Sequence, residues 1–247
     1  MVEHVRFGPL SLAQLDASRA VEWVIDAAST GRASIVVTSN IHHLRLAEVD
    51  PAFRAVLEQA ALNVADGWPL VAASKILRGP TLPERVAGVD LVENVLADAA
   101  KLQLAILGGP PGAATRLAQL AAERHDVVLV DELAKGRWER EEELSALEAA
   151  LARAAPNVTL IGIGAPKQEL LASRLVEVVS GPIVCCGAAI EIVAGVRPRA
   201  PRAVQRIGLE WAFRILLEPR RLVPRYVRSA ATFFRILLLE LAARGRR

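Results

Sequence analysis

The sequence predicts an α/β fold: a mostly parallel, Rossmann-like sheet with helices on both faces, followed by a helical C-terminal appendage that associates with a membrane. Three observations support this prediction. Short apolar runs alternate with helical stretches through the first 196 residues. These runs contain few polar residues, as expected of strands that are covered on both faces. The remaining residues carry a large excess of arginine, which indicates an anionic partner for the appendage.

Six short segments rich in aliphatic residues are the predicted strands. Strands that alternate with helices require right-handed crossover connections, which build a parallel sheet with helices on both sides. The predicted strands are Ala33–Thr38, Leu62–Ala65, Gln103–Leu107, Val127–Val130, Val158–Ile163 and Ile183–Cys186. The helical stretches between them include Gly112–Arg124, Glu139–Ala155 and Lys167–Val179.

The chain changes character at Gly195–Arg202, where two prolines and three arginines interrupt the pattern. We therefore divide it into an α/β core, residues 1–196, and a basic amphipathic helical appendage, residues 197–247. Helices are expected over Ala203–Leu217 and Val223–Ala243. Thirteen arginines and three glutamates give the appendage a charge of +10, whereas the core carries −7. Anionic lipid, nucleic acid and a phosphorylated substrate are the candidate partners.

The last apolar stretch, Ala230–Ala243, is 14 residues long and contains Arg235 and Glu240. It is too short and too charged to span a bilayer. An amphipathic helix of this kind lies in the membrane interface or packs on the core, and the sequence leaves both open.

Two features indicate the compartment. Cys185 and Cys186 are adjacent on a predicted strand, so their side chains point to opposite faces and do not form a mutual disulfide. The N-terminus lacks the apolar segment of a secretory signal. We expect a cytoplasmic protein that is peripheral on the inner face of the cell membrane.

Polar residues follow several of the predicted strands, at the edge where ligands bind to parallel α/β sheets. Thr38 and Asn40 follow the first strand, and Asp66-Gly67 follows the second. A carboxylate in this position can accept a proton from a substrate hydroxyl. The alternative for Asp66 is to cap the helix that begins near Trp68.

Glycine-rich turns follow two other strands. Gly108-Gly109 opens a helix and can present backbone N–H groups to a diphosphate, although turns of this kind also have purely structural roles. The turn partly matches a dinucleotide-binding pattern, with Asp131 at the end of the next strand as the ribose-binding acid. A nicotinamide-dependent Rossmann-type oxidoreductase is therefore the alternative function.

Gly164 precedes Lys167, Gln168 and Glu169 at the start of a predicted helix. Gln168 can hydrogen-bond sugar hydroxyls or a uracil edge, or can simply be exposed. Arg85 can bind phosphate or pair with Asp90.

His42-His43 has no acidic neighbours at metal-ligand spacing, and no D-x-D motif occurs in the chain. We therefore expect no metal site, and we expect these histidines on a helix surface or as caps. A leaving diphosphate would then need cationic side chains, which the appendage can supply.

Several motifs occur together in one order. They are Thr38-x-Asn40, Asp66-Gly67-x-Pro69-Leu70, Glu84-Arg85-Val86-x-Gly88-x-Asp90-Leu91, Leu107-Gly108-Gly109, Gly162-x-Gly164-x-Pro166-Lys167-Gln168-Glu169, Ala194-Gly195 with Arg199-Ala200-Pro201, and Gly208-Leu209-Glu210-Trp211-x-x-Arg214 followed by Glu218-Pro219-x-Arg221 and Arg225-Tyr226. The ordered set covers nearly the whole chain and resembles the WecG/TagA/CpsF glycosyltransferase family (glycosyltransferase family 26).

The resemblance implies an inverting, metal-independent hexosyltransferase that uses no cofactor. It would move a sugar of the N-acetylmannosamine type from a UDP-sugar to an undecaprenyl-diphosphate-linked acceptor, in teichoic acid or cell-surface polysaccharide synthesis. The implied partners are the donor, the polyprenyl-diphosphate-linked sugar and an anionic membrane surface. Few appendage aromatics are available to stack on bases, so no nucleic acid is expected. A homo-oligomer is left open.

The resemblance also assigns residues. Asp66 would be the catalytic base, Thr38 a further active-site residue, and the arginines of the appendage would lie near the diphosphate; these are Arg214, Arg221 and Arg225. The substrate-binding residues would be Asn40, Arg85, Gly108, Gly109, Gly164, Lys167, Gln168 and Glu169. This chain departs from many relatives at Ser39 and Ile41-His42-His43, in a loop expected to line the pocket, which leaves the identity of donor and acceptor open.

Overall fold

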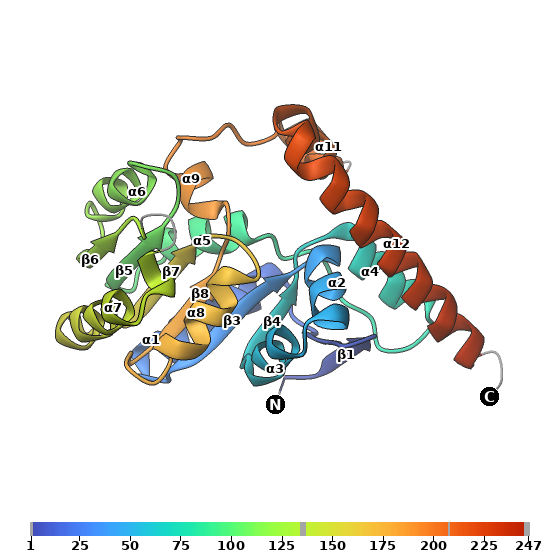
Figure 1. Ribbon diagram of the computed structural model, residues 1–247, viewed down its shortest axis with the longest axis horizontal. Coiled ribbons are helices and arrows are strands. Elements are labelled where there is room, and N and C mark those ends of the chain that lie inside the picture. The colour runs from blue at the N-terminus through green and yellow to red at the C-terminus, as the bar shows by residue number, and fades with distance from the viewer. Residues whose placement is uncertain (1, 134–136, 207, 245–247) are drawn as a thin grey trace.

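A six-stranded, all-parallel sheet forms the centre of the protein, in the order β4-β3-β8-β7-β5-β6. This computed structural model describes residues 2–133, 137–206 and 208–244. Helices cover both faces of the sheet, and a long C-terminal helix crosses one end of it (Figure 1). The predicted strands are all confirmed; their bounds are β3 Ser34–Ser39, β4 Leu62–Ala65, β5 Gln103–Gly108, β6 Asp126–Asp131, β7 Val158–Gly162 and β8 Pro182–Cys185.

Successive strand residues face two separate hydrophobic cores, which explains why the strands are apolar throughout. On β3, Ile35 and Val37 belong to one core and Val36 to the other, and each is at most 2% exposed. The first core is covered by α2 (Ile41–Val49), α3 (Pro51–Gln59), α4 (Trp68–Ile76), α7 (Glu141–Ala154) and α8 (Lys167–Leu175). The second is covered by α1 (Ala17–Ser29), α5 (Gly88–Ala97), α6 (Ala113–Ala121) and α9 (Ala189–Val193). A short 3₁₀ turn, η1 (Arg137–Glu139), precedes α7.

An antiparallel hairpin of β1 (His4–Phe7) and β2 (Leu10–Ala13) precedes the sheet and was not predicted. Its residues alternate, since Val5 and Phe7 are buried while His4 and Arg6 are exposed, so a strand signal was present. The turn contains Gly8 at φ +52°, and a Cβ there would lie 3.1 Å from Ile236. The hairpin therefore forms part of the seat for the C-terminal helix.

The appendage departs from the prediction in two places. The expected helix over residues 203–217 is wrong as one element: α10 (Arg202–Arg206) and α11 (Glu210–Leu217) are separate. Gly208 between them adopts φ +73°, and a Cβ there would lie 2.6 Å from the Trp68 ring, so the chain turns closely over that ring. Ile207, inside the predicted helix, lies outside the described residues. The last helix, α12 (Pro219–Arg244), begins earlier than expected.

One face of α12 packs on the core, and another stays uncovered. Phe233 lies against Phe7 with ring centroids 5.5 Å apart, and Ile236 and Leu237 are also buried. Packing on the core, one of the two alternatives for this segment, is therefore confirmed for that face. The exposed apolar residues of the helix are Val223, Val227, Phe234, Leu238, Leu239 and Leu241. Among the described residues, no helix combines the length and apolar character needed to cross a bilayer.

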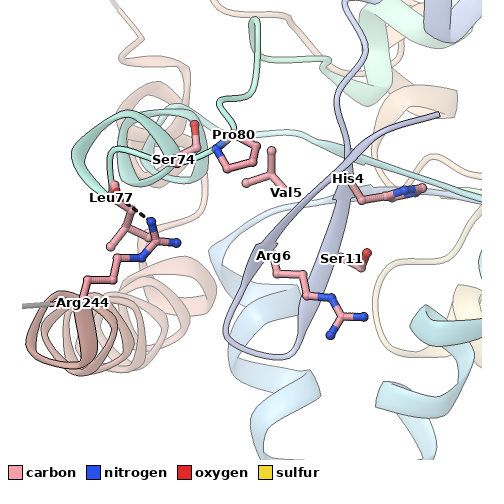
Figure 2. A pocket seen from close by; sticks show the side chains of 9 residues that line it. His4, Val5, Arg6, Ser11, Ser74, Leu77, Pro80 and Arg244 are labelled. Atoms are coloured by element: carbon pink, nitrogen blue, oxygen red, sulfur yellow. Dashed lines mark hydrogen bonds between the residues drawn. The ribbon is translucent and has the colours of Figure 1, made fainter. Parts of the chain in front are cut away.

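The end of α12 is fastened to the end of α4. The Arg244 guanidinium donates to the carbonyl of Leu77 (Figure 2), where a basic group is favoured by the helix dipole. A cavity of about 390 Å³ lies here between the hairpin, α4 and α12. Figure 2 shows Arg6 projecting from the hairpin beside Ser11, on the side away from Arg244.

Adjacent phenylalanines on α12 provide a test of this seating. Phe233 is 7% exposed and Phe234 is 60% exposed. Phe233→Ala should lower the free energy of unfolding by about 3 kcal/mol, because it leaves a cavity against Phe7. Phe234→Ala, the matched control, should leave it nearly unchanged in urea denaturation followed by circular dichroism. Equal effects of the two substitutions would contradict the orientation of α12 described here.

Candidate active site

A cavity of about 490 Å³ lies beyond the carboxyl ends of β4, β3 and β8, between the core and the appendage. The core contributes Asn40 and Asp66 from the ends of β3 and β4, Arg85 from the loop before α5, and Gly88 from the first turn of α5. The appendage contributes the opposite wall. Its lining residues include Glu210, Trp211, Arg214, Ile215, Leu222, Val223, Arg225, Tyr226, Val227, Ser229 and Ala230.

Asp66 lies at the edge of the sheet with its side chain at the cavity. Its backbone N–H donates to the carbonyl of Ser39 at 2.7 Å, which ties the ends of β3 and β4 together. The N-cap of α4 is Gly67, and no side chain caps this helix, so the alternative role of Asp66 as N-cap is wrong. Burial raises the pKa of the Asp66 carboxyl above its ordinary value. Such a carboxylate is a stronger base than an exposed aspartate.

Three arginines share this cavity with Asp66. Arg85 and Arg214 lower the pKa of Asp66, against the effect of burial. Burial first, together with the charges of Arg214 and Arg221, lowers the pKa of the Arg225 guanidinium to about 10. Within the described residues, the buried Nε of Arg214 has no hydrogen-bond partner. Crowded guanidinium groups with an unused donor are the arrangement expected where an anion binds.

Arg221 does not line this cavity. Its side chain is 59% exposed and pairs with Glu218 at the end of α11. Glu218 also pairs with Arg197, whose guanidinium lies 2.8 Å from Glu191 on α9. Arg221 and Arg225 are nevertheless one turn apart on α12, which does extend back past Arg221.

Gln168 and Glu169 are 3% and 0% exposed, behind the cavity wall. The Gln168 side-chain oxygen accepts from the backbone N–H groups of Gly164 at 3.1 Å and Gly187 at 3.0 Å. Its amide donates to Glu169 Oε1 at 2.7 Å. The two turns after β7 and β8 are therefore held together by one glutamine, and these glycine N–H groups are already used.

A histidine continues this network to the end of β3. His43 Nε2 lies 3.2 Å from Glu169 Oε1, and the backbone N–H of Asn40 donates to His43 Nδ1 at 3.3 Å. His43 completes the capping box of α2, so a capping role is confirmed for this histidine. The network fixes Asn40, which lines the cavity, from behind.

The other predicted residues also lie outside the described lining of the cavity. Thr38 is 6% exposed and donates to the carbonyl of Cys185 at 3.4 Å. Gly108 and Gly109 adopt positive φ values, and a Cβ on Gly108 would lie 2.4 Å from Ile163, so this turn is tightly packed. Lys167 forms an ion pair with Glu139 at 2.9 Å.

The oxidoreductase alternative depends on Asp131 as a ribose-binding acid, and the position of this side chain has a local explanation. The Asp131 side chain accepts from the backbone N–H of Leu133 at 2.7 Å, as in an ordinary turn. Its strand, β6, lies at the opposite edge of the sheet from β4 and Asp66.

Sequence reasoning missed several residues of the cavity. Trp68, Trp211 and Tyr226 form an apolar part of its wall, with the Trp211 and Tyr226 rings 6.0 Å apart. Glu210 stands beside Trp211 in a motif from which only Arg214 was selected. His42, expected on a helix surface or as a cap, lies in the cavity wall 3.5 Å from the Ser229 hydroxyl. Helical spacing alone does not indicate that these side chains converge.

Within the described residues, no group of three or more His, Cys, Asp or Glu side chains could hold a metal ion. A carboxylate and several guanidinium groups at the carboxyl ends of a parallel sheet define an α/β enzyme site suited to an anionic substrate. The model of the glycosyl transferase WecG/TagA/CpsF family matches residues 5–247, and the chain belongs to this family. The protein is therefore a glycosyltransferase, with a sugar donor and an acceptor, and the family indicates polysaccharide or teichoic acid synthesis.

The position of His42 predicts a dependence of stability on pH. Burial first, and then the charge of Arg225, lower the pKa of His42 from 6.5 to about 3. Between these two pH values the unfolded chain binds a proton that the folded protein excludes, so stability is lost as pH falls from 6.5. His42→Gln should lose less stability than the wild type between pH 7.5 and 4.5 in urea unfolding. Identical losses would show that His42 titrates normally.

Proposed function

We propose that the protein transfers a sugar of the N-acetylmannosamine type from a UDP-sugar to a sugar carried on undecaprenyl diphosphate, with inversion at the anomeric carbon. The product would enter cell-surface polysaccharide or teichoic acid synthesis. One observation supports this above all: Asp66 shares a cavity with Arg85, Arg214 and Arg225. The site thus offers a base and a cluster of cations to one substrate pair.

The chemistry is a single displacement. Asp66 accepts the proton of the acceptor hydroxyl while the oxygen of that hydroxyl attacks the anomeric carbon of the donor sugar. The bond from that carbon to the UDP oxygen breaks on the opposite side, which inverts the configuration. The negative charge that develops on UDP is stabilised by Arg214 and Arg225, with Arg221 joining from the preceding turn of α12. No metal is needed in this scheme.

Other residues of the site would bind and orient the substrates. Asn40 and Arg85 are at the cavity and can hydrogen-bond sugar hydroxyls or a phosphate. Trp68, Trp211 and Tyr226 suit the apolar faces of a sugar ring or the first units of a polyprenyl chain. We propose that Thr38, Gly164, Gln168 and Glu169 support this wall from behind. A direct role of Gly108, Gly109 and Lys167 in substrate binding stays a prediction, since these residues lie outside the described lining.

The uncovered face of α12 supports a position on the inner face of the cell membrane. Val223, Val227, Phe234 and Leu238 follow one another at spacings of four or seven residues and form one exposed apolar stripe along the helix. Arg228, which is exposed, lies beside it, as does Arg235, which pairs with Glu48. We propose that the stripe enters the lipid interface while the arginines contact anionic headgroups. Since Val223 and Val227 also line the cavity, a lipid-linked acceptor would reach Asp66 from this side.

Asp66→Asn keeps the shape of the side chain and removes the base. Transfer of radiolabelled sugar from UDP-N-acetylmannosamine to a short-chain polyprenyl-diphosphate sugar should fall by about 10²–10⁴-fold. Donor binding, measured by calorimetry, should be retained, and NAD(H) should not bind. A variant with near-normal turnover would rule out Asp66 as the base.

Membrane binding should depend on the exposed face of α12. Deleting residues 223–247 would also uncover Phe7, so point substitutions separate the effects better. Phe234→Ser should weaken co-sedimentation with anionic liposomes about tenfold. Arg214→Ala should abolish transfer and leave liposome binding intact, because it removes one charge from a cavity. If Phe234→Ser and Leu238→Ser bind liposomes like the wild type, the proposed membrane face is wrong.

A further inference from the structure

Arg85 is the point where the core and the appendage meet at the catalytic carboxylate. Its Nη1 lies 2.9 Å from Glu210 Oε2 on α11, while its Nη2 lies 3.8 Å from Asp90 Oδ2 on α5. The side chains of Arg85 and Glu210 are 14% and 12% exposed. The ion pair is therefore largely shielded from water, where its attraction is stronger than at a surface.

Asp90 is a weaker partner for Arg85 than Glu210 is. It pairs with Arg199, whose other guanidinium nitrogen lies 2.8 Å from Glu93. Because Arg199 takes up this carboxylate, Glu210 is the closer partner of Arg85.

We propose that Glu210 is a positioning residue: its ion pair holds Arg85 and prevents this guanidinium from pairing directly with Asp66, so that Asp66 stays ready to accept a proton. The inference rests on the proposed role of Asp66 as the base. Because Glu210 lies on α11, Arg85 is held in this way only when α11 is docked on the core.

The charges around Asp66 agree with this arrangement. Burial raises the pKa of Asp66, Arg85 and Arg214 lower it, Glu210 raises it, and the backbone N–H of Gly88 lowers it. Arg85 is the largest of the lowering influences. A guanidinium that pairs directly with an aspartate lowers its pKa by about one to three pH units, and the carboxylate then becomes a poorer base. Holding Arg85 at Glu210 avoids that loss while a cation for the substrate phosphate is kept nearby.

The decisive measurement is the pKa of Asp66 itself, read from the ¹³Cγ shift of labelled aspartate, with Asp66→Asn to assign the resonance. Glu210→Gln should lower this pKa by about one pH unit. Arg85→Gln should raise it. These opposite signs distinguish the effect of the ion pair from undocking of α11. If either substitution undocked α11, Asp66 would be exposed to water and its pKa would fall in both variants.

Glu218→Gln is the matched control. Glu218 is also on the appendage and pairs with Arg197 and Arg221, but it does not contact Arg85, so the pKa of Asp66 should stay unchanged. In transfer assays, the acid limb of kcat/KM should move to lower pH in Glu210→Gln and keep its position in Glu218→Gln. An unchanged Asp66 pKa in Glu210→Gln, or a lowered one in Arg85→Gln, overturns the proposal. A shifted Asp66 pKa without a shifted acid limb supports the ion-pair arrangement but overturns Asp66 as the base.

Discussion

The packing of α12 across the hairpin and α2 is the contact on which the cavity depends. Without it the carboxyl ends of β3 and β4 would face solvent, and Asp66 would have an ordinary aspartate environment. Phe233 and Ile236 are held against Phe7 and Gly8, residues at the opposite end of the chain. The same helix carries Arg225 into the cavity wall. Burial of one face of α12 against the core therefore fixes the position of the Arg225 charge on another face.

The charge distribution of the chain acquires a structural meaning in this arrangement. The excess of arginine in the appendage is not spread over one solvated surface. Some guanidinium groups are used to fasten the appendage, as Arg197 and Arg199 do with acids of α9 and α5. Others, Arg214 and Arg225, are placed in a poorly hydrated cavity near each other, which costs free energy unless an anion binds there. Such a free-energy cost is expected at a site that binds an anion.

Buried polar residues behind the cavity have a different purpose from those at its wall. Gln168, Glu169 and His43 connect the ends of three strands and leave few donors free for a ligand. They hold the wall in place, while the residues that face the cavity come from the ends of β3 and β4 and from the appendage. A position at the end of a strand therefore does not show whether a residue contacts the ligand or supports the residues that do.

The sequence alone determined the sheet and its polar edge. Continuous apolar runs such as the one ending at Thr38 predict strands that are buried on both faces, and this periodicity is local. It also placed Asp66 directly after a strand. The first strand of the hairpin alternates between exposed and buried residues over only four positions, a signal too short to stand out.

Only the tertiary structure decided which side chains meet. Arg85 and Glu210 are 125 residues apart, and His43 and Glu169 are 126 apart. The helices α10 and α11 are separated at Gly208, where the chain turns over the Trp68 ring. Local helix propensity takes no account of a residue so distant in the sequence. Likewise, α12 has two apolar faces, and only the shape of the hairpin and α2 determines which one is buried. Contacts of this kind are set by packing over the whole chain, because no pattern within a helix or strand specifies its distant partner.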